Sequence, residues 1–432
     1  MTNLGPGHAY VIDGPTRLEG EVSCSGAGKN SALKLLAAAL LAPGVAVVKR
    51  VPDIADLRWF ADVLRHLGVG VDHGAGEVKL TVPETMGFEA PYELVSRMRA
   101  STAVLSPLLA RQHRALVAMP GGDFLGPRPI DLHMKGLEAL GAEIKVVHGV
   151  IDATTDPGGL RGGVVRFDWP SHGATENIVI AACLAKGTTV IENAARDPEI
   201  VDLATFLRKM GAKIEGDGTT TITIEGVDEL RPVNYEVMPD RLEAGTFLFA
   251  TAAAGGDVTV TGMRPDHLDL VLEKLVEMGA QLDVGDDNVR IRMDGRPRAN
   301  DIATLPYPGF PTDLQAMALA VLTLADGMSI VTENVYDARF AYADELARMG
   351  ADVKVTAHHA VVRGVDGLMG APVRAHDVSA GAALVIAGLA ATGRTTVEDI
   401  IHIDRRYANL EGKLASLGAT IERVPHPAPI SR

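Results

Sequence analysis

Apolar segments that end at a glycine and continue into a short strand-like segment recur along the whole chain. The repeated pattern is a leucine, two or three residues, a leucine or methionine, then glycine, with an apolar residue soon after. A glycine that follows the last apolar residue of a helix commonly ends that helix. Each copy therefore predicts a helix end followed by a strand. By subtraction the copies are 68 to 73 residues apart, and their glycines are Gly68, Gly141, Gly211, Gly279, Gly350 and Gly418.

A second pattern precedes each copy and consists of an Ala- and Leu-rich helix, a turn with glycine, and a strand rich in Val, Ile and Thr. Residues 30–51, 176–194, 243–262 and 380–400 are examples. Such helices are apolar nearly all round, which predicts that they lie inside, with sheets outside. A regular period over the whole chain indicates internal repeats, and six units stacked as a solenoid are the structural alternative.

The composition fits a soluble globular protein with a large aliphatic core. Hydrophobic residues make up 47% of the 432 residues, whereas aromatic residues make up only 4%. The formal net charge of −14 argues against nucleic acid or an anionic membrane as the main partner. Small anionic substrates stay compatible with it, because a few clustered arginines and lysines can bind them locally.

The two cysteines, Cys24 and Cys183, lie in apolar segments, and neither belongs to a CxxC motif. A disulfide framework or zinc site is therefore not expected, and no metal or other cofactor is predicted. The N-terminal residues lack the basic and apolar pattern of a signal peptide, and no apolar stretch is long enough for a membrane span. These features predict a cytoplasmic protein.

Residues 120–133, PGGDFLGPRPIDLH, carry the most concentrated chemistry. A glycine pair precedes the acid Asp123, and Arg128 lies between two prolines. Glycines permit a sharp turn or a close approach to a ligand, and prolines restrict the backbone beside the arginine. An acid beside a held guanidinium suits proton transfer next to a bound anion. A surface turn with a solvated acid is the alternative.

The chain resembles the enolpyruvyl transferase family, and most closely its UDP-N-acetylglucosamine 1-carboxyvinyltransferase group. The resemblance covers nearly the whole chain. It rests on motifs in the family's order, namely GKNSALK (28–34), MRAS (98–101), the 120–133 segment, GATENI (173–178), ENAARDPEIVD (192–202), PDRLEAGTF (239–247), FPTDLQ (310–315), ARF (338–340) and HIDR (402–405).

The resemblance implies a two-domain inside-out α/β barrel, the enolpyruvyl transferase fold, with six repeats of about 70 residues, three in each domain. One domain is expected at 29–238. The other is expected to combine 1–28 with 239–432. The active site is expected in the cleft between the two domains.

The resemblance also implies a reaction. The family transfers the enolpyruvyl group of phosphoenolpyruvate to the 3-hydroxyl of UDP-N-acetylglucosamine by addition and elimination, and releases phosphate. This is the first committed step of peptidoglycan precursor synthesis, and so serves cell-wall biogenesis, cell shape and cell division. The expected partners are phosphoenolpyruvate and UDP-N-acetylglucosamine or another uridine nucleotide. The oligomeric state stays open, with a monomer compatible.

The reaction needs cations for the phosphate and carboxylate, an acid for the methylene carbon and a base for the hydroxyl. By resemblance, Lys29 and Arg405 are catalytic cations, Asp123 is the general acid and Asp313 is the base. Asp313 could equally be a helix N-cap. Most family members have cysteine where Asp123 stands, and that thiol is the target of the epoxide fosfomycin. A carboxylate is a poorer nucleophile there, which predicts fosfomycin resistance.

Further residues match substrate-binding positions of the family, although each alone could be a surface charge or a helix cap. Arg128 is expected to bridge the two substrates, and Asp377 to be an acid beside the basic cluster. The full set of expected binding residues is Asn30, Arg99, Arg128, Pro129, Asp131, Leu132, Ser171, Gly173, Val335, Arg339 and Asp377.

Four positions depart from the family pattern and leave the acceptor open. Gly28 is an extra glycine before the catalytic lysine, and His172 replaces a small apolar residue. Ser379 stands where an arginine is expected, and Arg406 where a glycine is expected. Two alternatives follow. One is a paralogue that transfers enolpyruvyl to another uridine nucleotide such as UMP, as in nucleoside-antibiotic biosynthesis. The other is an inactive nucleotide-binding relative.

Overall fold

The computed structural model describes residues 7–121 and 130–425. Within them the chain folds into two compact units. The first unit holds residues 26–121 and 130–238, and the second holds 7–25 and 239–425. Each unit carries three four-stranded sheets of the same topology, in which one parallel pair of strands is extended by antiparallel strands.

The first unit contains three sheets. The strands of the first sheet, in spatial order, are β14 (Asn234–Glu236), β3 (Gly44–Lys49), β5 (Glu77–Val82) and β4 (Gly70–Gly74). Those of the second are β6 (Glu89–Ala90), β7 (Arg114–Ala118), β9 (Val150–Thr154) and β8 (Glu143–Val147). Those of the third are β10 (Val164–Arg166), β11 (Thr188–Glu192), β13 (Thr221–Glu225) and β12 (Lys213–Glu215). Its helices are α1 (Lys29–Ala38), η1 (Ala39–Leu41), α2 (Ala55–His66), α3 (Tyr92–Val95), η2 (Arg99–Val104), α4 (Leu105–Gln112), α5 (Asp131–Ala139), α6 (His172–Ala182) and α7 (Pro198–Met210).

The second unit repeats this organisation. The strands of its first sheet, in spatial order, are β16 (Gln281–Val284), β17 (Asn288–Met293), β15 (Gly256–Thr261) and β2 (Leu18–Ser23). Those of the second are β18 (Ile302–Ala303), β19 (Met328–Thr332), β21 (His359–Arg363) and β20 (Asp352–Thr356). Those of the third are β22 (Pro372–Arg374), β23 (Gly393–Glu398), β1 (His8–Gly14) and β24 (Thr420–Pro425). Its helices are α8 (Arg241–Ala254), η3 (Pro265–His267), α9 (Asp269–Glu277), η4 (Thr312–Leu314), α10 (Gln315–Leu322), α11 (Ala343–Arg348), α12 (Val378–Ala390), α13 (Ile401–Asp404) and α14 (Leu410–Ser416).

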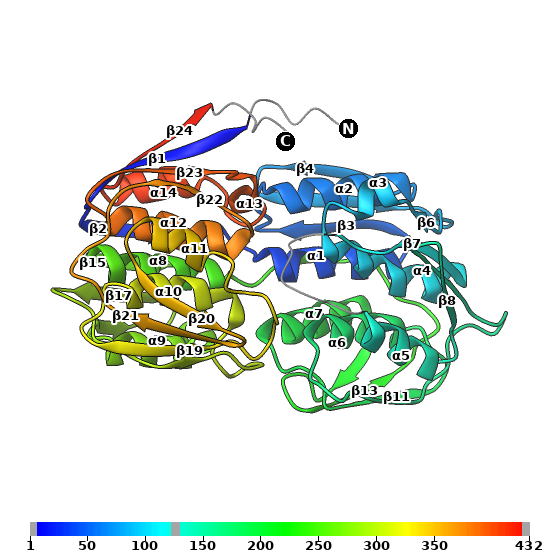
Figure 1. Ribbon diagram of the computed structural model, residues 1–432. Helices are drawn as coiled ribbons and strands as arrows, with labels where there is room; N and C mark the ends of the chain where they lie inside the picture. The colour runs from blue at the N-terminus through cyan, green and yellow to red at the C-terminus, as the bar shows by residue number, and fades with distance from the viewer. Residues whose placement is uncertain (1–6, 122–129, 426–432) are drawn as a thin grey trace. The chain divides into compact units, whose positions relative to one another are not determined.

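The most apolar helices form the centre of the second unit, as the hydrophobic pattern predicts. Helices α8, α10 and α12 contact one another, and almost all their residues are buried. The sheets surround them (Figure 1). A sheet that covers a core on one face shows alternating burial, and β15 alternates in this way. Helices inside and sheets outside confirm the predicted inside-out α/β fold.

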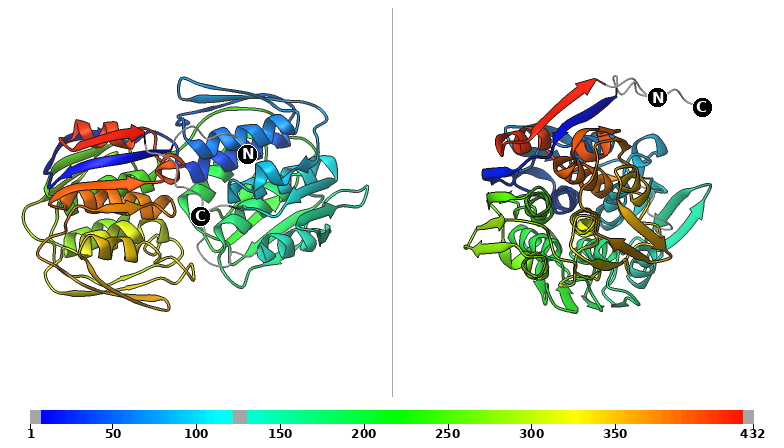
Figure 2. Two further views of the ribbon diagram at one scale, coloured as in Figure 1. Left: turned by 45° about the horizontal axis from the view of Figure 1, so that its top comes forward. Right: turned by 60° about the vertical axis from the view of Figure 1, so that its left-hand side comes forward.

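Each unit is closed by a strand from a distant part of the sequence. In the first unit β14 pairs in parallel with β3. In the second unit β1 pairs with both β23 and β24, and the blue β1 and red β24 run side by side in Figure 2. Neighbour-only contacts would leave the ends of a solenoid open. These pairings therefore rule out the six-unit solenoid.

The glycines of the repeated pattern all adopt positive φ. This left-handed conformation is easily reached only without a Cβ atom, and it reverses the chain from a helix into the next strand. The prediction of a helix end at each copy is confirmed at Gly68, Gly141, Gly211, Gly279, Gly350 and Gly418, where φ lies between 89° and 112°.

No helix in residues 7–121 and 130–425 combines the length and hydropathy needed to cross a lipid bilayer.

Candidate functional site

Lys29 is the first residue of α1 in the first unit. The preceding Gly28 is extended, with φ −65° and ψ 144°, and so directs the chain into the helix. The Lys29 Nζ lies 2.9 Å from Oδ2 of Asp56, whose side chain is only 1% exposed. A buried carboxylate therefore fixes the position of this ammonium group. Asn30 follows in the helix and is partly exposed.

The predicted diphosphate loop lies at the N-terminus of α6. The Ser171 hydroxyl caps the helix by accepting a hydrogen bond from the backbone N–H of Ala174, at 3.3 Å. A Cβ atom at Gly173 would lie 3.1 Å from Cε1 of His133. Any larger residue at 173 would therefore press on the His133 ring. Such a helix N-terminus favours anions, since its first N–H groups point outward.

Glu176, on the same helix, binds two cationic side chains. Its Oε2 lies 2.8 Å from Nζ of Lys34, and its Oε1 lies 3.0 Å from Nε2 of His172. Burial alone would lower the pKa of His172, but the carboxylates of Glu176 and Asp197 outweigh it and raise that pKa to about 10. Burial opposes ionisation of Glu176, yet His172 and Lys34 hold its pKa below the usual value. His172 is therefore protonated and Glu176 ionised at neutral pH.

His133 behaves in the opposite way. Burial, together with the nearby charges of Lys34 and Arg99, lowers its pKa to about 3, so the ring is neutral. Its Nδ1 is hydrogen-bonded to the side-chain amide of Asn177, whose Oδ1 accepts a hydrogen bond from Ser106 at 3.1 Å. His133 is therefore neutral, and its ring orientation is held by the hydrogen bond to Asn177.

The remaining predicted residues of this unit lie at helix starts. Arg99 opens η2 and is partly exposed. Asp131 opens α5 and is exposed, and Leu132 follows it. Asp123, Arg128 and Pro129 lie outside the described residues.

In the second unit, the carboxylate of Asp313 is held by two buried arginines. Oδ1 accepts a hydrogen bond from Nη2 of Arg339 at 2.6 Å, and Oδ2 accepts one from Nη2 of Arg406 at 2.9 Å. The arginine side chains are 4% and 5% exposed, whereas that of Asp313 is 24% exposed. The carboxylate thus has both arginines on its buried side and remains partly open to solvent.

Ser379 and Asp377 complete this arrangement from the start of α12. The Ser379 hydroxyl donates to the backbone carbonyl of Asp313 at 3.0 Å and accepts from Nη2 of Arg339 at 2.9 Å. Asp377 caps α12, because its Oδ1 accepts from the backbone N–H groups of Ser379 and Ala380 at 2.8 and 3.0 Å. These contacts fix Arg339 and the start of the helix together.

Val335 is linked through Glu333 to η4, and Arg405 follows α13, which packs against α12. The Val335 N–H donates to Oε1 of the fully buried Glu333 at 2.8 Å. Oε2 of Glu333 accepts from the Thr312 hydroxyl at 2.9 Å, beside Asp313. Arg405 directly follows α13 and is 6% exposed. The structure therefore brings Asp313, Arg339, Asp377 and Val335 into one network.

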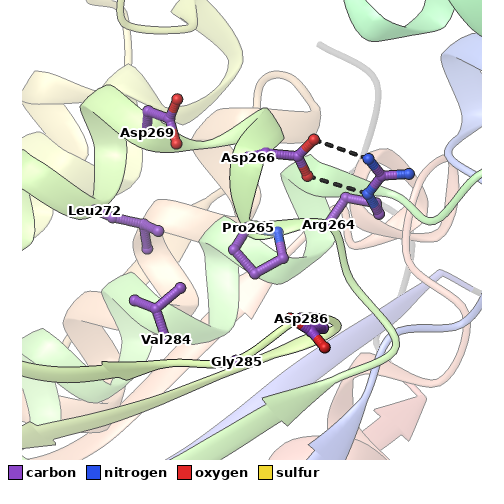
Figure 3. A pocket seen from close by; sticks show the side chains of 8 residues that line it. All are labelled: Arg264, Pro265, Asp266, Asp269, Leu272, Val284, Gly285 and Asp286. Carbon is purple, nitrogen blue, oxygen red and sulfur yellow. Dashed lines mark hydrogen bonds and ion pairs between the residues drawn. The ribbon is translucent and has the colours of Figure 1, made fainter.

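An open depression of about 510 Å³ lies elsewhere on the second unit (Figure 3). Arg264 and Asp266 line it and form a two-bond ion pair at 3.0 and 2.8 Å. None of the predicted site residues that the structure describes lines this depression. It is therefore separate from the candidate site.

Sequence reasoning missed several supporting residues. Asp56 looks like an ordinary acid in the first turn of an amphipathic helix, and Glu333 like a residue at a strand end. Lys34 offered a signal, because a lysine inside an otherwise apolar helix needs a buried partner. That partner is Glu176, which lies within the GATENI motif.

The chemistry of these groups suits an anionic substrate and an alcohol. The Asp313 carboxylate can accept a proton, and buried guanidinium groups can bind phosphate or carboxylate oxygens. Burial lowers the pKa of Arg339 and of Arg406, but Asp313 raises both well above the usual value, so both remain charged.

Comparison with known proteins defines the class of protein to which this chain belongs. A sequence model of the EPSP synthase (3-phosphoshikimate 1-carboxyvinyltransferase) family matches residues 12–414. The chain is 52% identical over 416 residues to the UDP-N-acetylglucosamine 1-carboxyvinyltransferase of Corynebacterium jeikeium, a match that covers 96% of this chain and 99% of the relative. It is also 52% identical over 417 residues to UDP-N-acetylglucosamine 1-carboxyvinyltransferase 2 of Carboxydothermus hydrogenoformans, with the same coverage.

Among solved structures, the enolpyruvyl transferase NikO from Streptomyces tendae matches with a TM-score of 0.87 at 26% identity, over 98% of this chain and 100% of that one. The fold and these similarities define an enolpyruvyl transferase. The chain belongs to the EPSP synthase family, and within it to the UDP-N-acetylglucosamine 1-carboxyvinyltransferase type.

Proposed function

We propose that this enzyme transfers the enolpyruvyl group of phosphoenolpyruvate to the 3-hydroxyl of UDP-N-acetylglucosamine, with release of phosphate, in the cytoplasm as an early step of peptidoglycan precursor synthesis. The observation that carries the choice of acceptor is the 52% identity, over nearly full length, to relatives of that name. The residues around Asp313 support the chemistry.

The reaction has two stages. In the addition, the sugar hydroxyl oxygen attacks C2 of phosphoenolpyruvate while Asp313 takes the hydroxyl proton. Asp123 donates a proton to the methylene carbon, which becomes a methyl group. In the elimination, the methyl group loses a proton, the C2–O bond to phosphate breaks, and the double bond is restored. The product is the enolpyruvyl ether, and inorganic phosphate leaves.

The proposed cations are Lys29, Arg128, Arg339 and Arg405, since the three negative charges of phosphoenolpyruvate need fixed positive partners. The ion pair between Lys29 and Asp56 supports this role, because it pre-orients the ammonium group. Asn30, Ser171 and Gly173 are proposed to bind the sugar nucleotide, together with Asp131 and Leu132.

Asp123 is proposed as the general acid in place of a thiol. A carboxylic acid can donate a proton near neutral pH only if burial or a nearby anion raises its pKa, and the substrate phosphate is such an anion. A carboxylate at this position also makes the enzyme resistant to fosfomycin, since the epoxide then lacks its thiol target.

Phosphate release tests the proposal. The protein is incubated with phosphoenolpyruvate and either UDP-N-acetylglucosamine or UMP. Release with the sugar nucleotide alone supports the proposal, and release with UMP alone assigns a different acceptor. The variant Asp313→Asn keeps the shape but removes the base, so it should lose turnover by at least about 100-fold. Exposed Asp366→Asn is the matched control and should retain full activity.

A further inference from the structure

Arg406 has one terminal nitrogen that donates a hydrogen bond and one that has no partner in the part of the chain that the structure describes. Nη2 donates to Oδ2 of Asp313 at 2.9 Å, and the side chain is 5% exposed. Nη1 is buried and has no hydrogen-bond partner among residues 7–121 and 130–425. A buried N–H group without an acceptor is costly, because it has lost its water and gained nothing in return. Such a donor indicates a site for an acceptor that comes from outside the chain.

The neighbouring arginine has a different environment. Arg339 donates from Nη1 to the Thr312 hydroxyl at 2.8 Å, and from Nη2 to both Asp313 and Ser379. Both of its terminal nitrogens are therefore engaged by the protein. Arg406 is thus the member of this pair with a terminal nitrogen left for a ligand.

Ser379 bonds to Arg339 and to the backbone of Asp313, whereas Arg406 bonds to the Asp313 carboxylate. Among the residues that the structure describes, the Ser379 hydroxyl bonds to the backbone carbonyl of Asp313 and to the guanidinium of Arg339. A serine carries no charge, so position 379 supplies no cation to the site. The second carboxylate oxygen of Asp313 receives its cation from Arg406 instead. Arg406 therefore supplies a cation beside Asp313, where Ser379 supplies none.

We propose that Arg406 binds an anionic oxygen of phosphoenolpyruvate, from its phosphate or its carboxylate, through Nη1 while Nη2 holds Asp313 in position. This inference rests on the proposed function and adds to it a substrate-binding residue. A planar guanidinium can do both at once, because its N–H groups point in fixed, different directions.

Steady-state kinetics of phosphate release test the role. Arg406→Gln removes the charge and should raise the KM for phosphoenolpyruvate roughly 10- to 100-fold, the loss expected for one charge-assisted hydrogen bond. The KM for the acceptor should change by less than about threefold, because the lost contact is to phosphoenolpyruvate and not to the nucleotide. Arg231→Gln, at an exposed loop arginine whose side chain is 82% exposed, is the matched control and should behave as wild type.

A relocated charge provides the second test. Arg406→Gly should weaken phosphoenolpyruvate binding in the same way, and adding Ser379→Arg should restore its KM to within about tenfold of wild type. If Arg406→Gln fails to fold, as judged by circular dichroism, the KM of this double variant for phosphoenolpyruvate decides whether the proposal holds. Failure of the folded double variant to bind phosphoenolpyruvate would overturn the proposal. So would an unchanged KM in Arg406→Gln, or an equal rise in both KM values.

Calorimetry separates this inference from the proposed function. Inorganic phosphate and pyruvate are titrated into wild type and Arg406→Gln without any acceptor. Weaker binding of phosphate by the variant assigns Nη1 to the phosphate, and weaker binding of pyruvate assigns it to the carboxylate. Equal binding of both probes by the two proteins contradicts the inference. If the wild-type enzyme does not turn over UDP-N-acetylglucosamine, the proposed acceptor is refuted, but the proposed role of Arg406 is not.

Discussion

Removal of Lys34 should destabilise the first unit far more than removal of a similar exposed lysine. Lys34 Nζ lies 2.8 Å from Glu176, whose side chain is 2% exposed. The substitution Lys34→Met keeps most of the side-chain volume and removes only the charge, so little of the effect comes from a cavity. What remains is a buried carboxylate that has lost one of its two cations.

The size of the effect follows from this geometry. Breaking a buried ion pair by removing one partner costs about 3–5 kcal/mol. His172 still contacts the other oxygen of Glu176 at 3.0 Å, so the loss should fall at the lower end, about 3 kcal/mol. For a unit of this size, that free energy corresponds to a fall in melting temperature of roughly 6–12 °C.

Urea unfolding followed by tryptophan fluorescence measures this loss in the correct unit, because both tryptophans, Trp59 and Trp169, lie within it. Lys213→Met is the matched control. Lys213 lies 2.6 Å from Glu225 in the same unit, but both side chains are about 60% exposed, so its loss should cost below about 1 kcal/mol. Equal losses of stability in the two variants would show that burial does not set the cost of removing the lysine.

Three further predictions concern single residues. The folded pKa of His172, about 10, exceeds its ordinary value of 6.5, so its contribution to stability is complete below pH 6.5 and is lost as the pH rises towards 10. His172→Gln should flatten the pH dependence of the free energy of unfolding in that window, which for one proton is at most about 1.4 kcal/mol per pH unit; an unchanged slope would contradict the assignment. Asp123→Asn should abolish turnover and leave nucleotide binding intact in calorimetry, and substantial residual activity would remove Asp123 from the acid role. Incubation with fosfomycin should leave the intact mass unchanged, whereas a covalent adduct on Asp123 would disprove the predicted resistance.

The repeat and its helix ends could be predicted from the sequence because they depend on local chemistry. A glycine that must take positive φ, as Gly211 does at 112°, marks a helix end wherever it lies. Helices α8, α10 and α12 are apolar on all faces, and this pattern likewise predicts that they are buried. Strand closure by β1 and β14 depends on pairing between distant segments, which no local pattern records.

The candidate site was only partly predictable for the same reason. Asp313 and Arg339 could be named from motifs, but their 2.6 Å contact joins residues 26 positions apart. The hydrogen bond between Arg406 and Asp313 joins residues 93 positions apart, and no local sequence pattern records such a pairing. A sequence departure such as Arg406 therefore acquires a physical meaning only when its partner is known.

Product analysis identifies the acceptor nucleotide of this enzyme. The protein is incubated with phosphoenolpyruvate and an equimolar mixture of UDP-N-acetylglucosamine and UMP, and mass spectrometry identifies which nucleotide gains an enolpyruvyl group. The expected product is enolpyruvyl-UDP-N-acetylglucosamine, with one phosphate released for each product molecule. Enolpyruvyl transfer to UMP alone, or no transfer to either nucleotide, would contradict the proposed acceptor.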